Sequence, residues 1–146
     1  MNVNELMTRD PASCRPDDVC AQAAMLMREE DCGSIPVVDD GRLVGIVTDR
    51  DITVRCVAAG HDPKTTRVSE VMSADPICVQ PDTSAEEATK IMAERQVRRL
   101  PVVADGRLVG IVVTAQLARS EKPGQVGKTI KDISEPASGR ASHARG

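Results

Sequence analysis

The chain has 146 residues, of which 40% are hydrophobic and 28% charged, and its formal net charge is −3 at pH 7. This length suits one domain or a tightly fused pair, and the composition is typical of a globular protein. The slightly negative charge and the absence of aromatic residues argue against a nucleic-acid partner. No apolar run approaches the roughly 18 residues of a membrane span, and the first residues do not resemble a signal peptide. We therefore expect a cytoplasmic protein with no membrane partner.

The sequence aligns with itself after a shift of 65 positions, without a gap. Residues 3–52 and 68–117 share 21 identities in 50 pairs, where average residue usage would give about three. The longest shared run is Asp-Gly-Arg-Leu-Val-Gly-Ile-Val, which occupies 40–47 and 105–112. The chain is therefore a tandem repeat.

Both repeats predict the same elements in the same order. Apolar periodicity, Asp-Pro breaks and Asp-Gly turns set their limits. The first repeat is predicted to contain a turn at 3–7, a strand at 12–14, a helix at 19–30, strands at 35–38 and 43–47, and a helix at 49–59. The second is predicted to contain the equivalent elements at 68–72, 77–79, 84–96, 100–103, 108–113 and 115–119.

Local signals mark the ends of several elements. Asp-Gly between two apolar runs is typical of a type I′ hairpin turn, which needs positive φ at both central residues. Thr83 and Glu86 have the spacing of a capping box at a helix start. Thr48 is the predicted N-cap of the helix at 49–59, and Gly60 its C-terminal stop.

The predicted fold class is α+β, with two β-α-β-β-α repeats packed through their sheets about a pseudo-twofold axis. A single repeat of this size would bury only about 60% of its unfolded surface, which favours pairing. The expected organisation is a first repeat at 1–60, a linker at 61–67, a second repeat at 68–120 and a polar tail at 121–146. We expect the tail to be partly disordered, with one or two helical turns at 126–133.

The repeats differ at the end of the second hairpin strand. The first copy continues as Gly45-x-x-Thr48-x-x-Asp51, whereas the second has Val113 and Gln116 at the positions of Thr48 and Asp51. A structural interpretation is available, because threonine is a common N-cap and an acid in the first turn suits the helix dipole. A functional interpretation is that the hydroxyl and carboxylate hold a ligand.

Two copies of (Ile/Leu)-Pro-Val-Val-x-Asp-Gly-Arg-Leu-Val-Gly-Ile-Val, each after a helix, resemble a pair of CBS domains, the arrangement called a Bateman module. The resemblance covers about residues 3–119. It implies a regulatory module that binds an adenosine-containing ligand (AMP, ADP, ATP, NAD or S-adenosylmethionine) between the repeats and associates as a homodimer. It implies no catalytic cofactor.

The resemblance also implies ligand contacts for individual residues. Thr48 and Asp51 match the positions that contact phosphate and ribose, and Arg50 is a further phosphate candidate. Arg98 and Arg99 lie where family members often carry basic residues that reach phosphates, so we expect one composite site. The adenine slot of this dominant site would be lined by Ser13, Cys14, Ile35, Pro36 and Val37. A second, weaker or empty site would involve Val79, Leu100, Pro101, Val113 and Gln116.

Other functions stay open at this stage. The weakened second copy is compatible with a protein-interaction or structural module that binds no ligand. Catalysis is not expected, because no set of nucleophile, base and orienting residue is recognisable. The five cysteines are an odd number without Cys-x-x-Cys spacing, so we expect buried, reduced thiols and no metal site with His61 or His143.

Overall fold

The computed structural model describes residues 1–119, and the elements follow the predicted order closely. The first repeat contains α1 (Val3–Leu6), β1 (Thr8–Arg9), α2 (Cys20–Glu30), β2 (Ser34–Asp39), β3 (Arg42–Thr48), α3 (Asp49–Asp51) and the π-helix η1 (Ile52–Val57). The second contains the 3₁₀-helix η2 (Val68–Glu70), β4 (Ser73–Ala74), α4 (Ala85–Arg95), β5 (Arg99–Ala104), β6 (Arg107–Val113) and α5 (Thr114–Ala118). The tail predicted at 121–146, including the helical turns at 126–133, lies outside the described residues.

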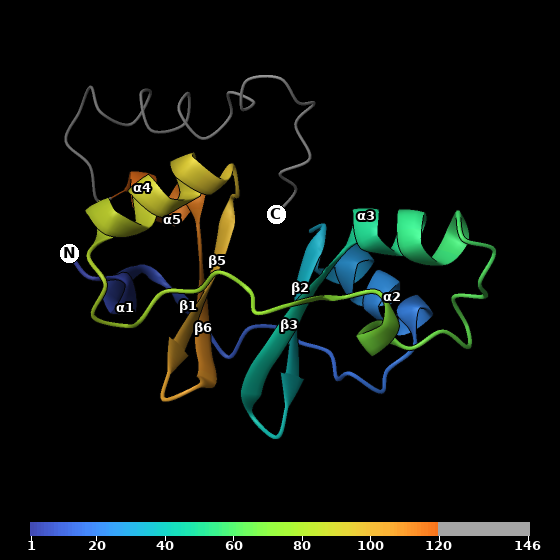
Figure 1. Ribbon diagram of the computed structural model, residues 1–146. Coiled ribbons are helices and arrows are strands. Elements are labelled where there is room, and N and C mark those ends of the chain that lie inside the picture. Colours follow the sequence, from blue (N-terminus) through green and yellow to red (C-terminus); the bar gives the residue numbers. More distant parts are fainter. Residues whose placement is uncertain (120–146) are drawn as a thin grey trace.

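The six strands form one antiparallel sheet that divides into two halves (Figure 1). The hairpin β2–β3 belongs to the first repeat and the hairpin β5–β6 to the second. A single residue pair, Arg42 with Arg107, joins β3 to β6 near the hairpin tips. The longer helices, α2 with η1 and α4 with α5, flank the hairpin of their own repeat, so the predicted α+β fold with two paired sheets is confirmed.

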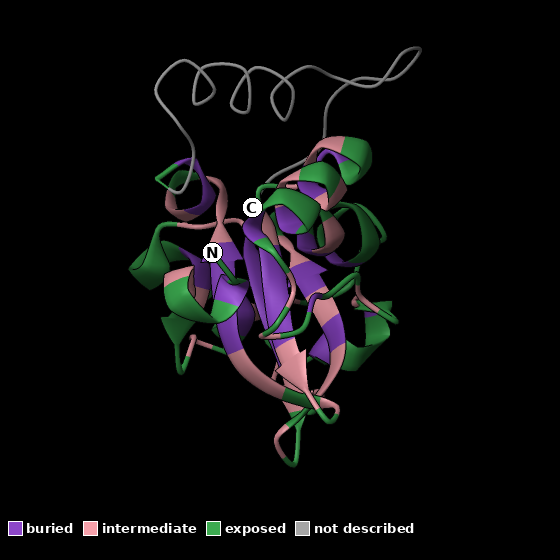
Figure 2. Cartoon of the chain, turned by 90° about the vertical axis from the view of Figure 1, so that its left-hand side faces the viewer, coloured by how far each residue is buried: buried purple, intermediate pink, exposed green. Residues whose placement is uncertain are grey.

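Each repeat contributes its short first strand to the sheet of the other repeat. β1 pairs with β6, and β4 pairs with β3. The two hydrophobic cores show the same exchange, because Val3 is buried in the second core, and Val68 and Val71 are buried in the first. Figure 2 shows the buried residues along the central strands and the inner faces of the helices. This exchange ties the repeats together more firmly than a simple contact between two sheets would.

Backbone groups at or just before the start of the opposite repeat also satisfy the helix N-termini. The N–H of Cys20, at the start of α2, donates to the Thr66 carbonyl at 2.8 Å. The matching N–H of Ala85, at the start of α4, donates to the Met1 carbonyl at 2.9 Å. The first N–H groups of a helix have no partner within it, so this exchange explains how α2 forms without a side-chain cap at Val19.

The predicted hairpin turns are confirmed, but the N-cap of α4 lies one residue later than predicted. Asp40 and Gly41 have φ of 52° and 80°, as a type I′ turn requires, and the second hairpin repeats this geometry. The capping box predicted at Thr83 is wrong, because Ser84 is the N-cap of α4 and accepts a hydrogen bond from the Glu87 N–H at 3.1 Å. The Thr83 hydroxyl instead accepts from the Gln80 N–H at 3.0 Å, in the turn before the helix.

Two other local predictions need correction. The strands predicted at 12–14 and 77–79 are single parallel bridges, Cys14 with Val37 and Val79 with Val102. The helix predicted at 49–59 begins as α3 but continues as the π-helix η1, in which Ala58 donates to the Thr53 carbonyl. Within the described residues, no helix is both long enough and apolar enough to cross a membrane.

Candidate functional site

Thr48 and Asp51 form a complete capping box at the end of β3. The Asp51 N–H donates to the Thr48 Oγ1 at 3.0 Å, and the Thr48 N–H donates to the Asp51 Oδ2 at 3.0 Å. The Asp51 Oδ1 lies 3.9 Å from the Arg55 Nε, and the Asp51 side chain is 13% exposed. The structural interpretation of both residues is therefore correct, and any ligand contact would be an additional role.

The end of β6 keeps only half of this arrangement. The Gln116 Oε1 accepts from the Val113 N–H at 2.9 Å, as Asp51 does for Thr48. Val113 has no side-chain acceptor for the Gln116 N–H, so the reciprocal bond is lost. The Gln116 Nε2 donates instead to the Thr8 Oγ1 at 2.8 Å.

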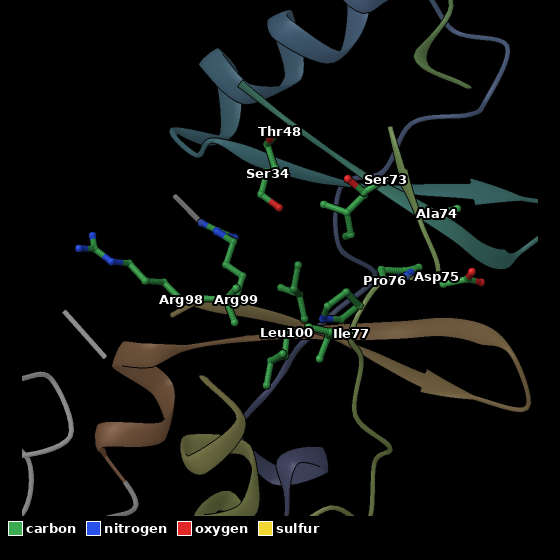
Figure 3. Close-up of a pocket in the computed structure, with 14 residues that line it drawn as sticks. Ser34, Thr48, Ser73, Ala74, Asp75, Pro76, Ile77, Arg98, Arg99 and Leu100 are labelled. Atoms are coloured by element: carbon green, nitrogen blue, oxygen red, sulfur yellow. The ribbon is translucent and has the colours of Figure 1, made fainter. Parts of the chain in front are cut away.

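A cavity of about 350 Å³ lies next to Thr48, between the two halves of the sheet. We call it the Thr48 cavity. Figure 3 shows Thr48 and Ser34 of the first repeat on one side, and Ile77 and Leu100 of the second repeat on the other. Its volume is at the lower end of the range for small-molecule sites.

The charged groups of the Thr48 cavity are separated. Arg98 and Arg99 lie at one end and Asp75 at the other (Figure 3). Neither guanidinium makes an ion pair with another residue of the described region 1–119. The lining between the ends includes the apolar residues Ile46 and Ile77. The cavity can therefore hold a flat apolar group with an anionic group beside the arginines.

A second cavity, of about 340 Å³, is related to the first by the repeat symmetry. It borders Val113 instead of Thr48, and we call it the Val113 cavity. Ile35 and Pro36 stand where the Thr48 cavity has Leu100 and Pro101. Its charged lining residues are Asp10, Glu30 and Arg99.

The structure groups the predicted site residues differently from the sequence-based prediction. Thr48, Arg98 and Arg99 do line one cavity, as the composite site requires. Leu100 and Pro101, assigned to the second site, line this same cavity, whereas Ile35 and Pro36, assigned to the first, line the Val113 cavity. The grouping fails because the two repeats face each other across each cavity.

The other predicted residues line neither cavity. Cys14, Val37 and Val79 are buried in the cores, at 2%, 0% and 5% exposure. Ser13 and Arg50 are exposed, and the remaining two, Asp51 and Gln116, act through the helix caps. Sequence reasoning missed the segments 73–77 and 8–12, which line the Thr48 and Val113 cavities respectively. Their repeated Asp-Pro pair was an available signal.

Burial governs the chemistry of the cysteines. It raises the pKa of the Cys14 thiol to about 12 and that of Cys20 to about 11, so both are protonated at neutral pH. Cys56 is also buried, as expected, whereas Cys32 is half-buried and Cys78 is exposed. All five are free thiols. Residues 1–119 contain no group of three or more His, Cys, Asp or Glu residues placed to hold a metal ion.

Two β-α-β-β-α units that exchange their first strands and enclose two related cavities define a tandem CBS pair, which is a regulatory module. The sequence model of the CBS domain matches residues 3–57 and 68–121. The chain belongs to the CBS domain family.

Relatives and solved structures of similar length support this assignment. The CBS domain-containing protein YhcV of Bacillus subtilis is 41% identical over 134 residues, which cover 91% of this chain and 95% of YhcV. The crystal structure of Hypoxic Response Protein I with two coordinated zinc ions has a TM-score of 0.76 at 37% identity, covering 84% of this chain and 100% of the other. The crystal structure of CBSX2 in complex with AMP has a TM-score of 0.70 at 29% identity, covering 89% and 98%.

Proposed function

We propose that this chain is a stand-alone regulatory module that binds an adenine nucleotide in the Thr48 cavity. The observation that carries the proposal is the combination, in one cavity, of an apolar slot and two arginines without ion-pair partners in the described region. A similarly folded protein, CBSX2, has been crystallised with AMP. AMP, ADP and ATP are the first ligands to test, with NAD and S-adenosylmethionine as further adenosine-containing candidates.

In this proposal each part of the ligand meets a different part of the cavity. The adenine ring packs against the apolar side chains of Ile46 and Ile77, which line the cavity and lie outside the two buried cores. The phosphate lies at the end where Arg98 and Arg99 stand, because charge-assisted hydrogen bonds to guanidinium groups are strong. The Thr48 hydroxyl accepts from the Asp51 N–H and keeps its own O–H as a donor. The ribose contact of Asp51 stays a prediction.

Regulation requires that the nucleotide bind two arrangements of the protein with different affinities. We propose that these are two geometries of a homodimer that acts on a partner protein and thereby senses the cell's energy state. Three exposed apolar side chains of the first repeat are candidates for association, since Met25 on α2 and Val54 and Val57 on η1 are 49%, 45% and 57% exposed. Light scattering with and without AMP would measure both the oligomeric state and its response.

The same exposed side chains favour a second candidate function, a protein-interaction module that binds no ligand. The two functions differ in what the arginines do. If the chain is an interaction module, the unchanged protein binds no nucleotide, so replacing Arg98 or Arg99 has no effect on nucleotide binding.

The composition of the chain makes the deciding experiment simple. A protein without Trp, Tyr or Phe absorbs very little at 260–280 nm, so a 260 nm peak that survives desalting and nuclease treatment reports bound nucleotide. Mass spectrometry would identify it. With ligand-free protein, calorimetry should show AMP, ADP or ATP binding that Arg99→Ala weakens and Arg95→Ala, on the exposed end of α4, does not. Absence of binding by all five candidate ligands would overturn the proposal.

A further inference from the structure

The side chain of Arg55, on the π-helix η1, connects the two repeats beside the Thr48 cavity. Its Nε lies 3.9 Å from the Oδ1 of Asp51, four residues earlier in the chain, and its Nη1 donates to the Val71 carbonyl at 3.2 Å. Asp51 belongs to the first repeat, whereas Val71 lies between η2 and β4 of the second. Arg55 therefore holds one group from each repeat at the same time.

Both partners of Arg55 lead directly to the lining of the Thr48 cavity. The Asp51 Oδ2 accepts from the Thr48 N–H, so the carboxylate that faces Arg55 also holds the residue that borders the cavity at the end of β3. Val71 is 1% exposed and stands two residues before the segment 73–77, which lines the same cavity (Figure 3). Arg55 itself is not part of the lining. It therefore fixes two parts of the cavity relative to each other from outside.

The segment 73–77 depends on such support because its own strand is short. β4 has only two residues, both exposed, and they pair with Gly45 and Ile46 of β3. A segment with few buried contacts and exposed backbone hydrogen bonds opens at a low cost in free energy. The hydrogen bond from Arg55 adds a contact just before β4, at a residue that is already anchored in the first core.

The second half of the molecule makes the corresponding connection in a different way. Gln116 matches Asp51, and its Nε2 donates directly to the Thr8 Oγ1 in the first strand of the other repeat, at 2.8 Å. An ionised carboxylate accepts hydrogen bonds but cannot donate them, so Asp51 cannot copy this bond and Arg55 supplies the donors instead. The sequence has Ser120 at the position that matches Arg55. The arginine thus accompanies the aspartate and not the glutamine.

We propose that Arg55 is a positioning residue for the Thr48 cavity. It ties the cap of α3 to the segment 73–77 and keeps the cavity in the shape that binds a nucleotide, without contacting the ligand. The inference rests on the proposed function of this cavity and deepens it, because ligand affinity then depends on a contact between the repeats. Loss of that contact weakens the binding of every ligand that fills the cavity, whether or not it carries a phosphate.

The test combines calorimetry and hydrogen exchange on the full chain. Arg55→Ala should weaken the binding of AMP and of adenosine by the same factor, about threefold to tenfold, as expected for a partly exposed charged contact. Without ligand, the amides of residues 71–77 should exchange faster than in the unchanged protein. The matched control is Arg67→Ala, which breaks an exposed ion pair with Asp17 (Nη1 to Oδ1, 3.6 Å) and removes no residue of the cavity lining. It should change neither quantity.

A double variant tests whether Arg55 acts through the cap. Asp51→Asn keeps an acceptor for the N–H of residue 48 but removes the charge that faces Arg55. In this background Arg55→Ala should not weaken ligand binding any further, because the connection needs both of its ends. A further loss equal to that in the unchanged protein would overturn the inference.

The remaining outcomes separate this inference from the function on which it rests. If Arg55→Ala weakens AMP binding alone, the arginine is a phosphate contact and not a positioning residue. Equal effects of Arg55→Ala and Arg67→Ala, or unchanged exchange at 71–77, also refute the inference while the nucleotide site stands. If the unchanged protein binds neither ligand, the proposed function fails, and unchanged exchange at 71–77 in Arg55→Ala would then refute the connection independently.

Discussion

The ends of β3 and β6 follow identical hairpins but support different chemistry. Both strands carry the same Arg-Leu-Val-Gly-Ile-Val sequence and pair in the same register with their hairpin partners. Directly after this shared sequence the repeats differ, with a reciprocal capping box at Thr48 and a one-sided one at Val113. The duplicated sequence therefore builds the scaffold, and the residues on either side of it, such as Thr48 and Arg98, distinguish the two cavities.

The comparison also shows that neither cavity belongs to one repeat. Thr48 from the first repeat faces Leu100 and Arg99 from the second, and the Val113 cavity reverses these origins. A change at Ser34, Arg99 or Ile111, which line both cavities, should therefore alter both. Variants that exchange equivalent residues between the repeats test this directly.

The largest effect is expected from the two arginines. In the double variant Arg98→Ala/Arg99→Ala, AMP affinity should fall by about 100-fold or more, because each charge-assisted hydrogen bond contributes about 1.5–3 kcal/mol. Adenosine affinity should change little, since adenosine has no phosphate. Calorimetry with both ligands measures the difference. An equal loss for AMP and adenosine would show that the arginines maintain the shape of the cavity and do not bind phosphate.

The strand exchange predicts a matched pair of destabilising changes. A Cβ at Gly45 would meet the Ser73 carbonyl at 2.9 Å, and one at Gly110 would meet the Thr8 carbonyl at 2.9 Å. Gly45→Ala and Gly110→Ala should each lower the free energy of unfolding by about 1–3 kcal/mol through overpacking. Urea denaturation followed by far-ultraviolet circular dichroism measures this. Unchanged midpoints would contradict the packing of β4 on β3 and of β1 on β6.

Exchanging the N-caps should shift stability in opposite directions. Thr48→Val removes a side-chain cap and should lower the free energy of unfolding by about 1 kcal/mol. Val113→Thr adds the missing acceptor and should raise it by a similar amount. The same urea titrations, at a neutral pH and without nucleotide, measure both. If Thr48→Val were neutral, the hydrogen bond from the Asp51 N–H would not contribute to folding.

The smallest expected effect concerns alkaline pH. Burial raises the pKa of Cys14 to about 12 from an ordinary value of 9.0, so the folded state favours the neutral thiol. The contribution of this thiol to the free energy of unfolding is complete below pH 9. It is lost as the pH rises from 9 towards 12, by about 1 kcal/mol between pH 8 and 10. Cys14→Val, which copies the equivalent Val79, should lose less stability over this interval. Equal losses in the two proteins would contradict the buried neutral thiol.

Much of the fold could be predicted from the sequence, because repeated local signals determine it. The helices at 20–30 and 85–95 and the two hairpins were predicted to within one or two residues. The exchange of β1 and β4 could not be predicted, since it depends on which repeat each short strand meets in space. For the same reason the residues around Thr48 and Ile35 were grouped incorrectly, although Thr48, Arg98 and Arg99 were brought together as expected.

The most direct test of the central claim is a crystal structure of the chain with AMP. The account predicts one AMP in the Thr48 cavity, with its adenine against Ile46 and Ile77 and its phosphate beside Arg98 and Arg99. AMP bound only in the Val113 cavity, or bound next to Thr48 with its phosphate turned towards Asp75, would contradict it.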